Sequence, residues 1–149
     1  MTTLRIPPPA WLAIALALII VLHRYFPIAL LVPTPWHYAG IGIASLGVVI
    51  AVWSVALFRH VRTTIIPFRE SAALITGGPY RFTRNPMYLS MAFILFSAAF
   101  FVGSLSPFVV VPIFILLIQM LFISREETML AERFPAEFPS YRLKVRRWL

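Results

Sequence analysis

The sequence predicts an all-α protein: an integral membrane helical bundle of about four transmembrane helices, followed by a cytoplasmic C-terminal amphipathic helix. Hydrophobic residues make up 60% of the 149 residues and charged residues only 12%, whereas soluble domains carry about 25% charged residues. The mean hydropathy is +0.88. Long apolar runs alternate with short polar segments, as expected of helices that cross a bilayer. We treat residues 1–149 as a single membrane-embedded domain.

The first predicted span covers about residues 8–22, which is short against the roughly 20 residues that a bilayer requires. It either ends there or extends through the apolar patch at residues 28–32, and a re-entrant patch is the third option. The run ends in His23-Arg24-Tyr25-Phe26 and not in the small residues of a cleavage site, so we expect an uncleaved span. Three prolines between residues 27 and 35 predict a kinked connection to the next span.

The second predicted span covers about residues 36–58 and is apolar throughout, with aromatic residues at its start that suit the membrane interface. Gly40, Gly42 and Gly47 lie within it. No strand precedes them, so a nucleotide-binding motif is disfavoured. Small residues in a membrane helix predict close packing against a neighbouring helix.

The third and fourth spans, about residues 86–102 and 108–123, are predicted to form an antiparallel hairpin across an uncharged turn. The Gly77-Gly78-Pro79 run cannot continue a helix and so marks a turn before the third span. Asn85 is a good N-cap, and Pro86 suits the first helical position because its missing N–H would be unpaired there anyway.

Charged residues are predicted to end the membrane part after residue 123, beginning with Arg125, Glu126 and Glu127. From Thr128 the chain begins as an amphipathic helix with apolar residues on one side. It then finishes in a basic segment, residues 142–147.

The charge pattern predicts which side of the membrane each segment faces. The chain has 13 Lys and Arg against 5 acidic residues, a formal charge of +8. With four spans and both termini cytoplasmic, 12 of the 13 basic residues face the cytoplasm and only Arg24 lies outside. We expect a multi-pass protein of the inner (cytoplasmic) membrane, in contact with membrane lipids and with no nucleic-acid partner. Cysteine is absent, so neither disulfides nor thiolate metal sites are available, and we expect no metal.

Two polar sites fall on this cytoplasmic side: the turn at residues 77–88 and the Glu126-Glu127 pair. The hairpin should make them neighbours, and paired carboxylates where an apolar span emerges are costly unless matched. One interpretation is that the glutamates simply pair with Arg125, Arg84 or the basic tail. Likewise Tyr80 and Tyr88 can be read as interface anchors, and Arg81 and Arg84 as ordinary positive-inside residues. The residue types alone leave these alternatives open.

The motifs themselves resemble a known family. Tyr80-x-x-x-Arg84-Asn85-Pro86-x-Tyr88, followed by Glu126-Glu127-x-x-Leu130-x-x-x-Phe134 and Tyr141, is similar to the isoprenylcysteine carboxyl methyltransferase and phospholipid methyltransferase superfamily. The resemblance covers roughly residues 62–148. Arg62-Thr63-Thr64-Ile65-Ile66-Pro67 and Asn85-Pro86-Met87-Tyr88 look closest to the phospholipid enzymes, and Leu74-Ile75-Thr76-x-Gly78-x-Tyr80 to the carboxyl methyltransferases. Asn85 and Phe122 stand where prenyl-protein enzymes carry His and Arg, which disfavours a prenylcysteine acceptor.

The resemblance implies S-adenosylmethionine as cofactor and S-adenosylhomocysteine as product. Glu126 would hold the ribose hydroxyls or the methionine ammonium, and Glu127 would support it or meet Arg84. Arg84 and Glu127 are the implied catalytic residues, and whether Arg84 contacts cofactor or substrate stays open. The residues implied to bind the cofactor are Leu74, Ile75, Tyr80, Asn85, Pro86, Met87, Tyr88 and Glu126.

The expected function is methyl transfer to a lipophilic or membrane-accessible acceptor that enters laterally between spans: a carboxylate, a thiol or an amino-lipid. A phospholipid N-methyltransferase is the specific alternative. An amine acceptor must lose a proton, which Glu127 or His60 would take. An alternative of another class is a non-enzymatic membrane protein whose basic face binds anionic lipid. The sequence does not set the oligomeric state.

Overall fold

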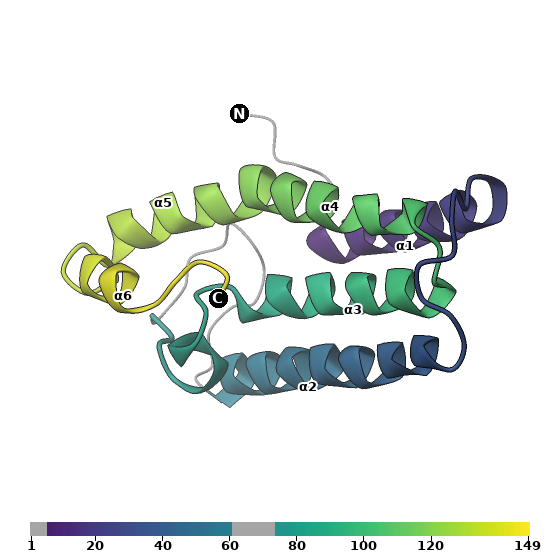
Figure 1. The fold of residues 1–149 in the computed structure, drawn as a ribbon. Coiled ribbons are helices and arrows are strands. Elements are labelled where there is room, and N and C mark those ends of the chain that lie inside the picture. Colours follow the sequence, from purple (N-terminus) through teal and green to yellow (C-terminus); the bar gives the residue numbers. More distant parts are fainter. Residues whose placement is uncertain (1–5, 61–73) are drawn as a thin grey trace.

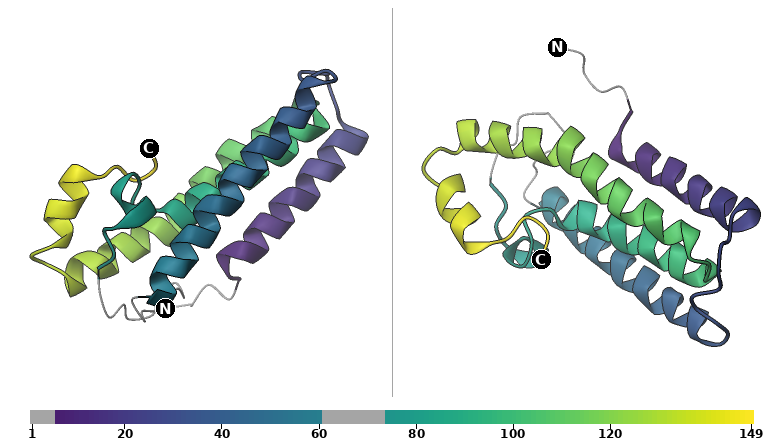
Figure 2. Two further views of the ribbon diagram at one scale, coloured as in Figure 1. Left: turned by 90° about the horizontal axis from the view of Figure 1, so that it is seen from below. Right: turned by 45° about the horizontal axis from the view of Figure 1, so that its top comes forward.

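The computed structural model describes residues 6–60 and 74–149, and within these ranges the fold is helical with no strand beyond an isolated bridge between Leu30 and Ser104. In chain order the helical elements are α1 (Pro8–Tyr25), η1 (Trp36–Tyr38), α2 (Ala39–His60), η2 (Gly78–Arg81), α3 (Pro86–Val102), η3 (Ser106–Val109), α4 (Val110–Ile118), η4 (Gln119–Ile123), α5 (Ser124–Arg133) and α6 (Phe138–Lys144). Helix α3 lies between α2 and α4 (Figure 1). Helix α1 packs on α3 and α4, as the turned views also show (Figure 2).

Three helical stretches are long and apolar enough to cross a membrane: Pro8–Tyr25, Trp36–His60 and Ser106–Arg133. The fourth, α3, is apolar but has only 17 residues, a length of about 25 Å at 1.5 Å per residue. It is nevertheless the most enclosed of the four, because α2 and α4 flank it on opposite sides. The predicted all-α membrane bundle is confirmed.

The connection after α1 corrects one expectation. The helix ends at Tyr25, so the alternative in which residues 28–32 extend the first span is wrong. Instead the main-chain N–H groups of Leu31 and Val32 donate to the carbonyl of Gly103, at 2.7 and 3.0 Å. A proline-rich chain cannot complete a helical hydrogen-bond ladder, and here its backbone groups pair with the α3–η3 turn.

Gly103 makes that pairing possible. It caps the end of α3 at φ 75°, and its N–H donates to the carbonyl of Ala99. Only glycine adopts this left-handed conformation without steric cost. A Cβ atom at this position would also lie 2.6 Å from the carbonyl oxygen of Val32. The uncharged turn predicted between spans three and four is therefore a tightly packed joint.

The helix of the fourth span continues beyond the point where the charges begin. Elements η3, α4, η4 and α5 form one helical stretch, Ser106–Arg133, so the amphipathic segment predicted from Thr128 begins within this same helix, and the membrane boundary after residue 123 stays a prediction. The helix widens to a π-turn at η4, where the Ser124 hydroxyl donates to the Gln119 carbonyl at 2.9 Å. Arg and Glu are good helix formers, so charges can mark the edge of a membrane without ending a helix. The short α6 follows after a turn.

Helices α2 and α3 pack closely through small residues, as predicted, but through two glycines and not three. A Cβ at Gly40 would lie 3.0 Å from the Ser97 carbonyl oxygen, and one at Gly47 the same distance from that of Ser90. The Ser97 hydroxyl also donates to the Gly40 carbonyl at 2.6 Å. Gly42 faces open space, so its predicted packing role is wrong.

Candidate functional site

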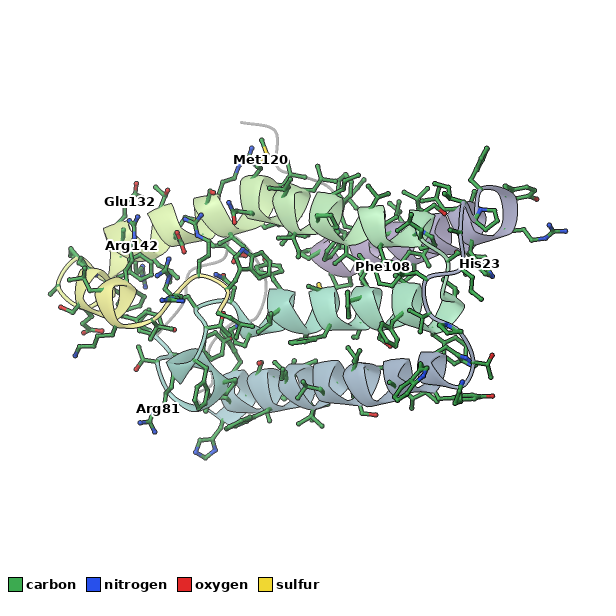
Figure 3. All side chains as sticks on the ribbon, viewed as in Figure 1. His23, Arg81, Phe108, Met120, Glu132 and Arg142 are labelled. Carbon is green, nitrogen blue, oxygen red and sulfur yellow. The ribbon has the colours of Figure 1, made fainter. Side chains whose placement is uncertain are left out.

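The charged residues of the bundle gather where α3 begins and α5 leaves it. We call this the charged end and define it as η2, residues 82–85, the first turn of α3, α5, α6 and residues 145–149. Figure 3 shows Arg81, Glu132 and Arg142 at this end, and His23 and Phe108 at the opposite one. The prediction that the turn and the glutamate pair are neighbours is confirmed by direct contacts between them.

The first contact joins Tyr88 to Glu126. Tyr88 lies in the first turn of α3 and is only 6% exposed. Its hydroxyl donates to Glu126 Oε1 at 2.7 Å, and its ring lies 6.4 Å from that of Phe122. The other oxygen of Glu126 accepts no hydrogen bond, and neither oxygen has an ion-pair partner, within the described residues. Glu126 thus keeps acceptor capacity beside an aromatic ring.

Tyr80 approaches the same carboxylate from η2. Its ring packs edge-on against Phe58, with centroids 5.7 Å apart. Burial raises the pKa of the Tyr80 hydroxyl, and the nearby Tyr141 and Glu126 raise it further. The Tyr141 hydroxyl donates to the Tyr80 carbonyl at 2.7 Å, and burial raises the pKa of Tyr141 to about 12. These tyrosines therefore stay neutral at physiological pH.

Glu127, one residue on, has a contrasting environment. Its Oε1 accepts from Nε and Nη2 of Arg84, at 3.2 and 2.8 Å. Arg147 donates to both of its oxygens. The side chains of Arg84 and Glu127 are only 8% and 10% exposed. Glu127 in turn raises the pKa of Arg147 above its ordinary value by accepting these hydrogen bonds. Of the alternatives left open for the glutamates, ion pairing describes Glu127, whereas Glu126 has no ion-pair partner among residues 6–60 and 74–149.

Residues 145–148 lie alongside the turn that precedes α3. Thr83 Oγ1 and Asn85 Nδ2 both donate to the Arg147 carbonyl at 3.0 Å. The main-chain N–H of Arg84 donates to the Arg146 carbonyl at 2.9 Å. Asn85 does occupy the N-cap position of α3, but its side chain makes no capping hydrogen bond. Its amide is used to hold the returning chain instead.

The remaining residues implied to bind the cofactor take little part in the contacts described above. Leu74 and Ile75 are half-buried in the segment before η2 and take no part in the hydrogen bonds above. Pro86 is fully buried, and the Met87 carbonyl accepts from the Ser90 hydroxyl at 2.7 Å. The Arg62–Pro67 motif lies outside the described residues.

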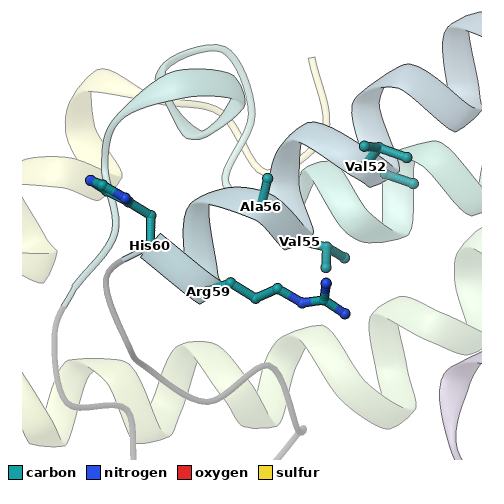
Figure 4. Close-up of a pocket in the computed structure, with 6 residues that line it drawn as sticks. Val52, Val55, Ala56, Arg59 and His60 are labelled. Carbon is teal, nitrogen blue, oxygen red and sulfur yellow. The ribbon is translucent and has the colours of Figure 1, made fainter.

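A groove on α2 lies apart from this cluster. It has a volume of about 720 Å³ and is lined by Ala51, Val52, Val55, Ala56, Arg59 and His60. Figure 4 shows the side chains of Arg59 and His60 extending in opposite directions from the end of the helix. The turn at Gly78 lies against Trp53 and Leu57 of α2. His60 follows Trp53 by seven residues, which at 100° per residue places the two on about the same side of α2, and His60 is exposed.

Sequence reasoning missed Arg147 and Trp148. Arg147 is one of several basic residues near the end of the chain, and nothing in its spacing separates it from Arg146, which is exposed. Trp148 donates its indole N–H to Gln119 Oε1 at 3.0 Å and packs on the hydrophobic core. The available signal in the sequence was the large aromatic Trp148 directly after the basic residues.

Comparison with known proteins gives a consistent picture. An uncharacterized protein of Haemophilus influenzae is 44% identical over 63 residues, which cover 42% of this chain and all of that protein. No solved structure matches the chain. A family model described as phospholipid methyltransferase matches residues 35–137, more than half of the chain and including both the turn before α3 and the glutamate pair. This confirms the resemblance inferred from those motifs: the chain belongs to the phospholipid methyltransferase family.

Proposed function

We propose that this chain is an S-adenosylmethionine-dependent methyltransferase that methylates a lipophilic acceptor reached from the membrane. The observation that carries the proposal is the Glu126 carboxylate, one oxygen of which accepts no hydrogen bond from the described residues, beside Tyr88 and near Tyr80. An unpaired carboxylate at the end of an apolar hairpin is costly and marks a site of function. In a family of methyltransferases, the cationic cofactor is the natural ligand for it.

The residues around Glu126 fit that cofactor chemically. Its ammonium and ribose hydroxyl groups are hydrogen-bond donors, which a free carboxylate oxygen accepts. Tyrosine faces attract a cation, and the half-buried Leu74 and Ile75 are apolar. Bound cofactor supplies an electrophilic methyl group, and the protein's part is to orient it toward the acceptor, because positioning provides most of the acceleration.

We propose that Arg84 and Glu127 hold this site together and contact neither cofactor nor acceptor. Arg84 already donates to Glu127 and to the carbonyls of Arg142 and Val145, at 3.1 and 2.6 Å. Both Glu127 oxygens are taken by arginine donors. Neither side chain has much capacity left for a ligand. Glu127 is then poorly placed to accept a proton from an amine.

For the acceptor, the family favours an amino-lipid over a carboxylate or thiol. An amine is protonated near neutral pH and must lose a proton before it attacks the methyl group, so it needs a proton acceptor. We place the charged end in the cytoplasm, where 12 of the 13 basic residues would then lie.

The first test is the binding of S-adenosylhomocysteine to detergent-purified protein, measured by calorimetry. The parent and Glu132→Ala should bind alike, since Glu132 is exposed on the same helix. Glu126→Ala should lose binding, and Tyr88→Phe, which removes only the hydroxyl bonded to Glu126, should weaken it. No binding by a folded parent in several lipids and detergents would reject the methyltransferase and favour the lipid-binding scaffold.

The acceptor needs a separate experiment. Protein incubated with methyl-labelled cofactor should transfer label to vesicles of an amine-headgroup phospholipid. Vesicles with the same acyl chains but a hydroxyl headgroup are the control. Label on neither, together with label on a fatty acid or lipophilic thiol, would refute N-methylation while leaving the methyltransferase in place.

A further inference from the structure

The chain returns to the site after α6 in a way that nothing in the helical bundle requires. Residues 145–148, which we call the clasp, run along the Thr83–Asn85 turn. Three donors from that turn reach two successive carbonyls of the clasp: the Arg84 N–H to Arg146, and the Thr83 hydroxyl and Asn85 amide to Arg147. This segment is anchored by specific polar contacts and not by apolar packing alone.

The Arg147 side chain reaches from the clasp to α5. Its guanidinium donates to both oxygens of Glu127, while Arg84 donates to Glu127 Oε1 from the other side. Two cations thus share one carboxylate. A planar guanidinium that bonds both carboxylate oxygens fixes the orientation of that carboxylate as well as its charge.

A second anchor holds the other end of the clasp. Trp148 donates to Gln119, the first residue of the π-turn from which α5 departs. The clasp therefore contacts the helix that carries Glu126 at two residues, one before Glu126 in the sequence (Gln119) and one after it (Glu127). Glu126 itself bonds only Tyr88 among the described residues.

We propose that Arg147 is a positioning residue of the methyltransferase site. By fixing Glu127, it holds the adjacent Glu126 with its free oxygen turned toward the ligand, although Arg147 itself does not touch the ligand. This inference rests on the proposed function, and it adds a determinant that lies outside the residues matched by the family model.

The test compares Arg147→Ala with Arg146→Ala in the full chain. Both remove one positive charge from the clasp, but the Arg146 side chain is exposed and makes no hydrogen bond or ion pair within the described part of the chain. Arg147→Ala should weaken S-adenosylhomocysteine binding about tenfold or more, as when a partner that orients a ligating side chain is lost. Arg146→Ala should bind like the parent. Millimolar guanidinium chloride should restore binding to Arg147→Ala, and sodium chloride at equal concentration should not.

A cofactor-independent readout separates this inference from the proposed function. Hydrogen exchange at the Arg84 amide, which donates to the Arg146 carbonyl of the clasp, should be slow in the parent and in Arg146→Ala, and should accelerate in Arg147→Ala while α3 stays protected. Unchanged exchange in Arg147→Ala would overturn the clasp, whether or not the parent binds S-adenosylhomocysteine. Faster exchange with unaltered affinity would overturn the positioning role. If Arg147→Ala does not fold, Arg147→Lys, which keeps the charge but not the two-oxygen contact, should show the same loss of affinity.

Discussion

The two ends of the bundle are closed by different chemistry. At the charged end, Glu127 is held between Arg84 and Arg147, and Glu126 lies beside them with an oxygen to spare. The opposite end has no such ion pair in the part of the chain that the structure describes. There His23 bonds the Ser104 hydroxyl at 2.8 Å, the Ser106 hydroxyl donates to the Phe26 carbonyl, and the chain after α1 pairs with the Gly103 turn.

This contrast distinguishes the contacts that close an end of the bundle from those that indicate a functional site. Neutral hydrogen bonds suffice to close a bundle end, since backbone groups leaving an apolar region need only be satisfied. Charged side chains at such a boundary have a larger desolvation cost, so they are expected either to pair with each other or to serve a function. Arg84, Glu127 and Arg147 meet the first condition. Glu126 does not, and it is therefore the residue on which the proposed site depends.

The largest effect should come from removing Glu127. Glu127→Ala leaves the buried guanidinium of Arg84 and that of Arg147 without their shared carboxylate. Loss of one partner of a buried pair costs about 3–5 kcal/mol of unfolding free energy. Chemical denaturation in mixed micelles would measure it, with the exposed Glu132→Ala as control. Equal, small losses in both variants would show that the ionic cluster adds nothing net to stability.

A smaller effect is expected midway between the ends. An alanine at Gly47 would put its Cβ 3.0 Å from the Ser90 carbonyl and 3.1 Å from the Phe93 Cβ, forcing α2 away from α3 at a cost of about 1–3 kcal/mol. Gly42→Ala meets nothing within 4 Å and should be neutral or slightly stabilising. The same denaturation experiment compares the two, and an equal response would mean that α2 does not depend on close approach to α3.

The smallest loss of stability is expected at the end of the bundle opposite the charged end. Ser104→Ala removes the hydrogen bond from His23, and because the His23 side chain is exposed its ring can bond water instead. We expect a loss of about 0.5–1 kcal/mol, with unchanged S-adenosylhomocysteine binding in calorimetry. Ser45→Ala, whose hydroxyl bonds only within its own helix, is the control. A loss of S-adenosylhomocysteine binding in Ser104→Ala would contradict the conclusion that only the charged end takes part in binding.

Much of this architecture was visible in the sequence. Apolar runs located the spans, and Asn85-Pro86 located the start of α3 at the correct residue. The hairpin then placed the 77–88 turn beside Glu126 and Glu127. These features depend on near neighbours: on periodic burial and on residues that cannot continue a helix. They persist in almost any packing of the chain.

Other features depended on which distant groups come within reach. The sequence offers several basic residues as partners for Glu127, and only the course of the chain after α6 selects Arg147, 20 residues away, over exposed Arg146. The same return gives the Asn85 amide a carbonyl to bind in place of its own helix. Likewise, three glycines in α2 look equivalent until α3 docks against two of them.

The sequence by itself thus determined the class of fold, the end of the bundle that carries charge, and the residue types available there. Only the tertiary structure decided how the two glutamates divide their roles. Adjacent residues on a helix point about 100° apart, so one side chain can face two arginines while its neighbour faces two tyrosines. Their partners lie 38 residues away in α3, 43 residues away in the turn before α3 and 20 residues away in the clasp. Local sequence patterns do not show which of such distant groups will meet.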